Sequence, residues 1–374
     1  MACATRWAKQ AADLPASTLD SRRLCRRTVP PDREGVAHGA LCDYALRSCP
    51  PAAQGGESAR ACVAAVRAAC DLPSFAAGMA AEKRLFDDLL YHSLQGRAYR
   101  HVFFAERATA SGRGGGGGAR QELGQGRGSV GVIGAGTMGR GIAVAFLRAG
   151  YGPVALVDIN PEGLAAGVEN IRALLQAEAK KGRLSPAKAK DAMSRLVPST
   201  DLASLADCDL VVEAAFESLA VKRDIFKKLD VLVRKPDALL LSNTSTLDVD
   251  AIAATLSPPR RAACAGMHFF SPAHVMKLVE VIRGRDTARE TLAAVRAVTK
   301  RLRKVPVVVG NCDGFVGNRM IHPYTTEATL LLAECGGSED GAKVADVDAA
   351  LGPRGFGMAV GPFVVSDLAG NDIG

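Results

Sequence analysis

Three features that mark other classes of protein are missing from this sequence. No run of apolar residues approaches the ~20 that a membrane-spanning helix needs, and no secretory signal peptide is recognisable. The cysteines lack metal-binding spacing, since the intervals from Cys42 to Cys49 and from Cys62 to Cys70 do not match those of zinc ligands. We therefore expect no metal site, and we expect free thiols in a reducing compartment.

Positive charge is in moderate excess, but it is not concentrated. The formal net charge is +8, and the Lys and Arg residues are scattered along the chain. Arg22, Arg23, Arg26 and Arg27 form a small cluster, which we interpret as solvated surface because acidic residues lie nearby and no amphipathic helix accompanies it. The charge gives no reason to expect a nucleic-acid partner, and it fits an anionic cofactor or substrate as well as ordinary solvated surface.

The first part of the sequence predicts a helical leader followed by a linker. Apolar residues recur at helical spacing between residues 59 and 107. His92 and His101 lie there without a patterned carboxylate or cysteine partner, so we interpret them as surface residues. Residues 109–128 are rich in glycine and predict a flexible linker. We therefore expect a leader over residues 1–108 and a new domain from residue 129.

The stretch from Ser129 to Gly139, Ser-Val-Gly-Val-Ile-Gly-Ala-Gly-Thr-Met-Gly, predicts a strand, a glycine-rich turn and a helix. In such a unit Gly134 permits the tight turn, Gly136 lets a pyrophosphate approach the backbone, and Gly139 lets the helix pack closely on the strand. The N-terminus of the helix offers free N–H groups to the phosphates. A glycine-rich turn in some other α/β protein is the alternative.

A second apolar strand, residues 154–157, ends at Asp158. A carboxylate in that place can accept hydrogen bonds from both ribose hydroxyls of a dinucleotide, and it would repel a 2′-phosphate. The sequence therefore predicts a bound NAD rather than NADP.

Strand-like and helix-like segments alternate over residues 129–309. Further buried strands are predicted at 210–214, 239–241 and 305–309. Helix starts are predicted at Asn160-Pro161, at Ser185-Pro186 and at the capping box of Thr287 and Glu290. This alternation predicts an α/β fold with a Rossmann-like, doubly wound and mostly parallel sheet. After it the strands stop, and residues 310–374 predict the start of an all-helical domain that is incomplete.

The stretch from Met267 to Ile282 can supply a catalytic base and its partner. His268 lies near the end of one predicted strand, and Glu280 lies in the next strand in an apolar context. If the two strands are neighbours, the carboxylate can reach the imidazole and fix its tautomer. A satisfied core histidine is the alternative interpretation of His268. His274, in the turn between the strands, is a weaker candidate for the base.

Small polar residues follow another predicted strand. Ser242 to Thr246 lie at its carboxyl end, where ligands bind in sheets of this kind. They suit contacts with a cofactor and a substrate, although Ser245 or Thr246 could also cap the helix that follows. Asn318 lies in the first helix after the strands and could donate to a substrate oxygen.

Together these residues resemble the 3-hydroxyacyl-CoA dehydrogenase family of fatty-acid β-oxidation. The matching motifs follow one another over residues 129–374 and are GAGTMG, VDIN, DLVVEAAFESLAVK, SNTST, HFFSPAHVMKLVEV, GFVGNRM and MAVGPFVVSDLAG. The resemblance implies NAD as the cofactor, an acyl-CoA as the substrate and oxidation of a 3-hydroxyacyl-CoA to a 3-ketoacyl-CoA.

The resemblance also implies roles for single residues. His268 resembles the general base, Glu280 its partner, and Ser245 and Asn318 the pair that contacts the substrate. Ser271 resembles a contact to cofactor or substrate, and Lys181 matches a CoA-binding position more weakly. The implied cofactor contacts are Gly134, Gly136, Met138, Gly139, Asp158, Glu217, Lys222, Ser245 and Ser271.

The leader is similar to the tail of an enoyl-CoA hydratase domain, as in peroxisomal or glyoxysomal multifunctional β-oxidation proteins. The similarity rests on residues 75–86 and 101–107. The hydratase core, with its oxyanion glycines and paired glutamates, is absent, so we expect no hydratase activity. The resemblance implies a peroxisomal location, with the cytoplasm as the alternative. The chain resembles a fragment whose oligomeric state, acyl-chain preference and turnover stay open.

Two other functions stay open on the sequence alone. One is a non-catalytic fragment that binds NAD or CoA and lacks turnover because its second domain is incomplete. The other is a dehydrogenase of the same cofactor fold that acts on a small hydroxy acid. The second is disfavoured by His268 with Glu280, because such an enzyme would more often use a lysine base.

Overall fold

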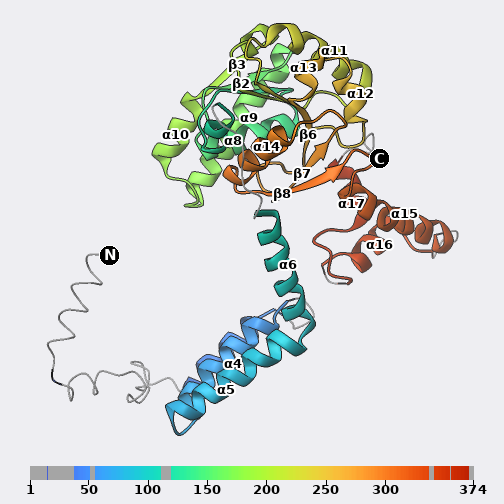
Figure 1. Cartoon of the computed structure of the whole chain (residues 1–374). Coiled ribbons are helices and arrows are strands. Elements are labelled where there is room, and N and C mark those ends of the chain that lie inside the picture. The colour runs from blue at the N-terminus through green and yellow to red at the C-terminus, as the bar shows by residue number, and fades with distance from the viewer. Residues whose placement is uncertain are drawn as a thin grey trace. The chain divides into compact units, whose positions relative to one another are not determined.

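The computed structural model describes residues 15, 38–50, 55–110, 119–336, 341–353 and 355–369. The chain forms two compact units, Met1–Glu106 and Arg107–Gly374, and Figure 1 shows their elements. The arginine cluster near the N-terminus, the glycines at 114–118 and the last five residues lie outside the described residues.

The first unit is helical. Its elements are α3 (His38–Ser48), α4 (Glu57–Asp71), α5 (Phe75–Asp87), the π-helical turn η3 (Asp88–His92) and most of α6 (Leu94–Ala110). Helix α4 packs against both α3 and α5, and Ser74 begins α5 by accepting a hydrogen bond from the amide of Ala77. His92 and His101 are exposed, as expected for surface histidines.

The second unit is built on one eight-stranded sheet. Its strands are β1 (Val130–Ile133), β2 (Val154–Val157), β3 (Leu196–Ser199), β4 (Leu210–Glu213), β5 (Leu239–Ser242), β6 (Cys264–Phe269), β7 (Leu278–Arg283) and β8 (Val305–Gly310). The order across the sheet is β3-β2-β1-β4-β5-β6-β7-β8. Strands β1 to β6 are parallel, β7 runs antiparallel to β6, and β8 is parallel to β7. The predicted mostly parallel, Rossmann-like sheet is confirmed.

Helices cover both faces of this sheet (Figure 1). They are α8 (Thr137–Ala149), α9 (Pro161–Lys180), α10 (Pro186–Ser194), the 3-10 turn η4 (Leu202–Leu205), α11 (Leu219–Leu232), α12 (Val249–Ala253), α13 (Pro258–Arg261) and α14 (Arg289–Arg301). Successive strand residues enter different cores: Leu239 and Leu241 of β5 pack in one cluster and Leu240 in the other. This two-sided burial explains why the strands read as continuous apolar runs.

The predicted helix starts are confirmed only in part. Asn160 begins α9 by accepting from the amides of Glu162 and Gly163, with Pro161 in the first turn. The predicted capping box before α14 is wrong, because the residue that precedes this helix is Ala288, which offers no side-chain cap. The Thr287 hydroxyl instead accepts from the amide of Gly284 and donates to the carbonyl of Cys264. It therefore ties a loop to the sheet.

Part of the segment expected to be a flexible linker is ordered. Residues Ala119–Gly124 form a short helix, α7, which packs against α14. Leu123 is buried in the main core, and its carbonyl accepts a hydrogen bond of 2.5 Å from the Tyr151 hydroxyl. The sheet unit therefore begins before residue 129.

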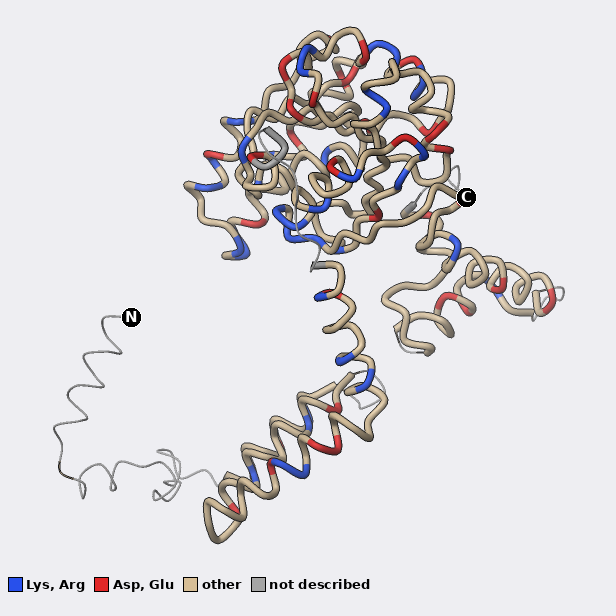
Figure 2. Tube along the Cα trace, in the orientation of Figure 1, with Lys and Arg blue, Asp and Glu red and all other residues tan. Residues whose placement is uncertain are grey.

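The strands stop after β8, as predicted, and three helices follow. These are α15 (Gly317–Cys335), α16 (Val344–Leu351) and α17 (Pro362–Ala369), which contact one another. Helix α17 was not anticipated. No helix in the described part of the chain combines the length and the hydropathy that crossing a membrane requires. Basic and acidic residues are interspersed along the trace of the sheet unit (Figure 2).

Candidate active site

Three glycines, two between β1 and α8 and one in the first turn of α8, are needed for three different reasons. Gly134 has φ +98°, and a Cβ there would lie 2.4 Å from the carbonyl oxygen of Ala214. A Cβ on Gly139 would lie 1.8 Å from the carbonyl oxygen of Gly134. A Cβ on Gly136 would meet nothing within 4 Å. Gly136 therefore borders open space beside the first N–H groups of α8, which have no side-chain cap. An anion such as a pyrophosphate fits there.

Asp158 follows β2 beside this turn. Its Oδ2 accepts from the amide of Ala135 at 2.8 Å, and its Oδ1 accepts from the amide of Asn160 at 2.9 Å. Each carboxylate oxygen keeps lone-pair capacity for a further donor, as a ribose recognition group requires. Met138 is half-buried and packs against the core of the sheet unit. The turn, the helix N-terminus and the carboxylate together fit a dinucleotide.

The predicted base and its partner meet across two neighbouring strands. His268 of β6 lies directly opposite Glu280 of β7 in the antiparallel register. The imidazole Nδ1 lies 2.9 Å from Glu280 Oε2, and the two residues are 4% and 1% exposed. The other carboxylate oxygen, Oε1, accepts from the backbone amides of Val316 at 3.0 Å and Gly317 at 2.8 Å, where α15 begins.

These contacts decide the tautomer of His268. Burial alone would raise the pKa of Glu280, but the hydrogen bonds from His268 and from the amides of Gly317 and Val316 lower it below its ordinary value. An ionised carboxylate only accepts hydrogen bonds, so Nδ1 must carry a proton. Nε2 is then free to accept one. The ring lies against Phe270 and Phe315, at centroid distances of 4.6 and 5.8 Å.

The polar turn after β5 lies beside this pair. The Asn243 side chain accepts from the amide of Phe269 at 2.8 Å, which ties the turn to β6. Asn318 donates to the carbonyl of Ser245 at 3.2 Å, so the structure brings together the two residues expected to contact a substrate. The alternative role of Ser245 or Thr246 as a helix cap is wrong, because Asp248 caps α12.

Glu217 and Lys222 take part in a buried network behind this turn. Lys222 is fully buried, and its ammonium donates to Glu213 at 2.7 Å and lies 3.1 Å from Glu217. Lys222 therefore makes these contacts within the protein, and its expected contact with a cofactor stays a prediction. Glu213 was missed by the sequence reasoning. The available signal was a carboxylate that ends an apolar strand, Leu210–Glu213.

Three other residues lie apart from the pair. Ser271 is exposed in the loop between β6 and β7. His274 is partly buried in the same loop, where burial and the nearby Arg148 lower its pKa. Lys181 ends α9 and is exposed, and α9 packs on β3, at the far edge of the sheet from β7.

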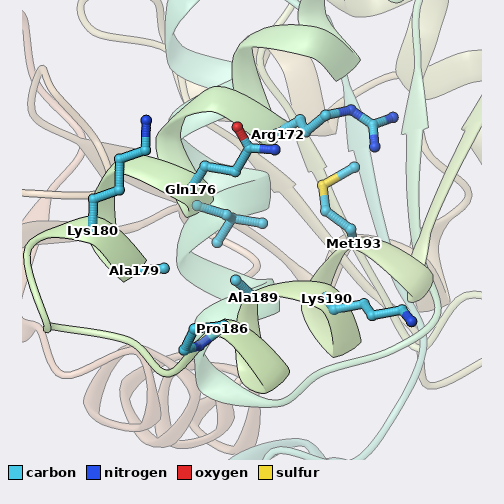
Figure 3. A pocket seen from close by; sticks show the side chains of 9 residues that line it. Arg172, Gln176, Ala179, Lys180, Pro186, Ala189, Lys190 and Met193 are labelled. Carbon is cyan, nitrogen blue, oxygen red and sulfur yellow. The ribbon is translucent and has the colours of Figure 1, made fainter.

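A groove of about 400 Å³ lies between α9 and α10 (Figure 3). Its wall combines apolar side chains such as Leu175 and Met193 with Arg172, Lys180 and Lys190, and it does not include Lys181. Among the described residues, no group of three or more His, Cys, Asp or Glu side chains could hold a metal ion.

Comparisons with known proteins point to one family. Residues 129–312 match "3-hydroxyacyl-CoA dehydrogenase, NAD binding domain", and residues 314–374 match "3-hydroxyacyl-CoA dehydrogenase, C-terminal domain". The human peroxisomal bifunctional enzyme is 42% identical over 99% of this chain and 48% of its own length. A peroxisomal fatty acid beta-oxidation multifunctional protein of Arabidopsis thaliana is 40% identical over 72% of this chain and 35% of its own.

A solved structure covers the dehydrogenase part. The (S)-3-hydroxybutyryl-CoA dehydrogenase of Ralstonia eutropha is 38% identical, with a TM-score of 0.59, over 66% of this chain and 83% of its own. The chain spans about half the length of the human relative. The strands, the paired His268 and Glu280 and these matches lead to one conclusion: the chain belongs to the 3-hydroxyacyl-CoA dehydrogenase family and carries its NAD-binding domain.

Proposed function

We propose that this chain oxidises an (S)-3-hydroxyacyl-CoA to the 3-ketoacyl-CoA with NAD, as part of fatty-acid β-oxidation. The observation that carries the proposal is the buried pair of His268 and Glu280, which has a defined tautomer beside the turn of Ser245. Among the relatives, the Ralstonia eutropha protein is named for (S)-3-hydroxybutyryl-CoA and the plant protein for fatty acid beta-oxidation.

His268 acts as the general base. Its Nδ1 proton is held by Glu280, so Nε2 takes the proton of the 3-hydroxyl as the bond between C3 and its hydrogen breaks and the carbonyl forms. The imidazolium that results is stabilised by the carboxylate of Glu280, as in other histidine–carboxylate pairs. Bound NAD supplies the acceptor for the hydride that leaves C3.

The cofactor is held by the turn of Gly134, Gly136 and Gly139 and by Asp158. The N–H groups at the start of α8 receive the pyrophosphate, with Met138 beside them, and Asp158 receives the adenosine ribose. Because a carboxylate repels a 2′-phosphate, NAD is preferred over NADP. Glu217 and Ser271 complete the cofactor contacts that we propose.

The substrate is held by the hydroxyl of Ser245 and the side-chain amide of Asn318, two residues that are joined by the hydrogen bond from Asn318 to the Ser245 backbone carbonyl. These groups donate to the oxygen on C3, whose negative charge grows as the proton leaves. Lys181 is proposed to contact the CoA moiety, on the resemblance alone.

The organisation that we propose follows the sequence: a leader over 1–108, the NAD-binding domain over 129–309 and a helical segment over 310–374. The segment between the first two contains α7. Hydratase activity is not proposed. A peroxisomal location is proposed from the names of the human and plant relatives.

The test is oxidation of NADH by acetoacetyl-CoA, followed for this chain and for the His268→Gln variant. We expect turnover by the unchanged chain, loss of turnover in the variant, and equal NADH affinity in both. Equal loss of turnover and NADH affinity in the variant would show that His268 is structural. NADH binding without turnover in the unchanged chain would favour the non-catalytic fragment.

A further inference from the structure

A buried ionic cluster lies at the carboxyl ends of β4 and β5. Glu213 and Ser242 are the last residues of these strands, lie opposite one another in the parallel register, and are both fully buried. Glu213 Oε2 accepts from the Ser242 hydroxyl at 2.6 Å. Glu213 Oε1 accepts from the Lys222 ammonium at 2.7 Å and from the amide of Ala215 at 2.8 Å.

All three N–H donors of the Lys222 ammonium face acceptors within the protein. An ammonium has three N–H donors, and this one faces Glu213 Oε1 at 2.7 Å, Glu217 Oε2 at 3.1 Å and the carbonyl of Ala215 at 3.4 Å. Lys222 is therefore committed to the protein, and Glu217 is the member of the cluster that is partly exposed, at 22% of its side chain.

The cluster carries one uncompensated negative charge. Burial alone would raise the pKa of Glu217, but Lys222 and the hydrogen bonds from Thr244 and Ser245 lower it below its ordinary value, so Glu217 is ionised. Glu213 accepts an ammonium, a hydroxyl and an amide, and none of these contacts calls for a protonated carboxyl. Two carboxylates and one ammonium leave a net charge of −1.

The same cluster holds the turn that carries Ser245. Glu217 Oε1 accepts from the Thr244 hydroxyl at 2.5 Å and from the amides of Ser245 at 2.8 Å and Thr246 at 3.4 Å. Asn243, in the same turn, is bonded to the backbone of β6 next to His268. The charge is thus fixed at the edge of the sheet where the reacting groups meet.

We propose that Glu213 is a positioning residue, and that the charge of the cluster of Glu213, Lys222 and Glu217 raises the affinity of the site for oxidised NAD relative to its affinity for reduced NADH. This inference rests on the proposed function. The oxidised nicotinamide ring carries one positive charge and the reduced ring is neutral, so a fixed negative charge near the reacting centre stabilises only the oxidised form. A charge in a poorly hydrated site acts more strongly than the same charge in water.

The experiment measures the dissociation constants of NAD⁺ and NADH separately, by calorimetry, for the unchanged chain and for Glu213→Gln. The variant keeps the shape of the side chain and brings the cluster to zero net charge. We expect the ratio of the NADH constant to the NAD⁺ constant to fall by about 6- to 17-fold, which is the effect of a unit charge over about 10–15 Å at an effective dielectric near 20.

Two further variants separate charge from folding. Glu217→Gln removes the same charge and leaves the buried pair of Glu213 and Lys222 intact, so the ratio should fall in the same direction even if Glu213→Gln does not fold. The double variant Glu213→Gln/Lys222→Met restores a net charge of −1, and the ratio should return toward that of the unchanged chain.

Asp209 provides the matched control. It lies just before β4, at the opposite end of the strand from Glu213, and its carboxylate accepts from Lys235 at 2.6 Å and from the amide of Ser129 at 2.8 Å. Asp209→Asn removes a partly buried, ion-paired charge and should lower stability without changing the ratio. A ratio that stays within twofold in both Glu213→Gln and Glu217→Gln overturns the inference alone. If the unchanged chain binds neither nucleotide, the proposed function fails with it.

Discussion

Replacing Glu280 by Gln tests the catalytic pair sharply, because the structure decides which way the new amide turns. Glu280 Oε1 accepts from the amides of Val316 and Gly317, and Oε2 lies against Nδ1 of His268. Glutamine has only one oxygen. If that oxygen faced His268, two buried amides would lose their acceptor, at a cost of about 1–3 kcal/mol each. The oxygen therefore stays with the two amides, and the NH₂ group turns to His268.

This orientation reverses the tautomer of His268. Facing an NH₂ donor, Nδ1 must become an acceptor, and the ring proton moves to Nε2, which can then no longer take a proton from the substrate. The same carboxylate-to-amide change in a serine protease triad lowers kcat about 10⁴-fold. We expect a fall in kcat on the order of 10³–10⁴ for Glu280→Gln, equivalent to about 4–5.5 kcal/mol of activation free energy.

The assay is NADH oxidation with acetoacetyl-CoA at saturating substrate, combined with NADH binding by fluorescence and thermal melting. NADH affinity should change less than threefold. Glu178→Gln is the control, since Glu178 is mostly buried and ion-paired with Arg148 and Arg183, but lies on α9. Its kcat should match that of the unchanged chain. A kcat for Glu280→Gln within tenfold of the unchanged chain would refute the assignment of the tautomer and of the base.

Three further predictions concern the nucleotide turn and acid stability. Gly139→Ala should destabilise the fold by about 1–3 kcal/mol or more, because its Cβ would lie 1.8 Å from a backbone oxygen. Gly136→Ala, by contrast, should melt within a few degrees of the unchanged chain. Calorimetry should show that this second variant binds NADH roughly tenfold more weakly. Asp158→Ala should weaken NADH binding roughly tenfold or more and should not weaken NADPH binding, because the repulsion of the 2′-phosphate is removed; equal weakening of both would contradict the ribose contact. The lowered pKa of Glu280 means that its ionised form stabilises the fold above the ordinary value of 4.5 and that this contribution is lost as the pH falls through the folded pKa. The melting-temperature difference between the unchanged chain and Glu280→Gln should therefore be constant above pH 4.5 and shrink below it, and a difference that grows on acidification would contradict the sign.

The parts of the fold that the sequence predicts are those in which local pattern and burial agree. Strands buried on both faces read as apolar runs, and Asn160-Pro161 specifies a helix start by its own chemistry. Strand β3, Leu-Val-Pro-Ser, was not anticipated, because only its first two residues are strongly apolar and a proline follows them directly. Proline is tolerated there because β3 is an edge strand, and edge position is a property of the whole sheet.

The site, too, could be predicted only where its residues come from strands that are close in the sequence. His268 and Glu280 could be paired from the sequence because two strands joined by a short loop were expected to be neighbours, and the register bears this out. The partners of Glu213 could not be paired, since Ser242 is brought to it by a strand 29 positions further along the chain. The role of Lys222 was implied by the resemblance alone, and its burial could not be foreseen, because a buried lysine and an exposed one look alike in a helical pattern.

Glu280 connects the two parts of the second unit, the sheet and the helices that follow it. Its carboxylate orients the base on β6 and, through the amides of Val316 and Gly317, fixes the first turn of α15, which carries Asn318. Asn318 in turn donates to Ser245, which belongs to the turn organised by Glu217. One chain of hydrogen bonds therefore connects the base, the start of the helical region and the buried ionic cluster. Because ionised carboxylates hold both ends of this chain, the geometry of the site depends on their charge as much as on their shape.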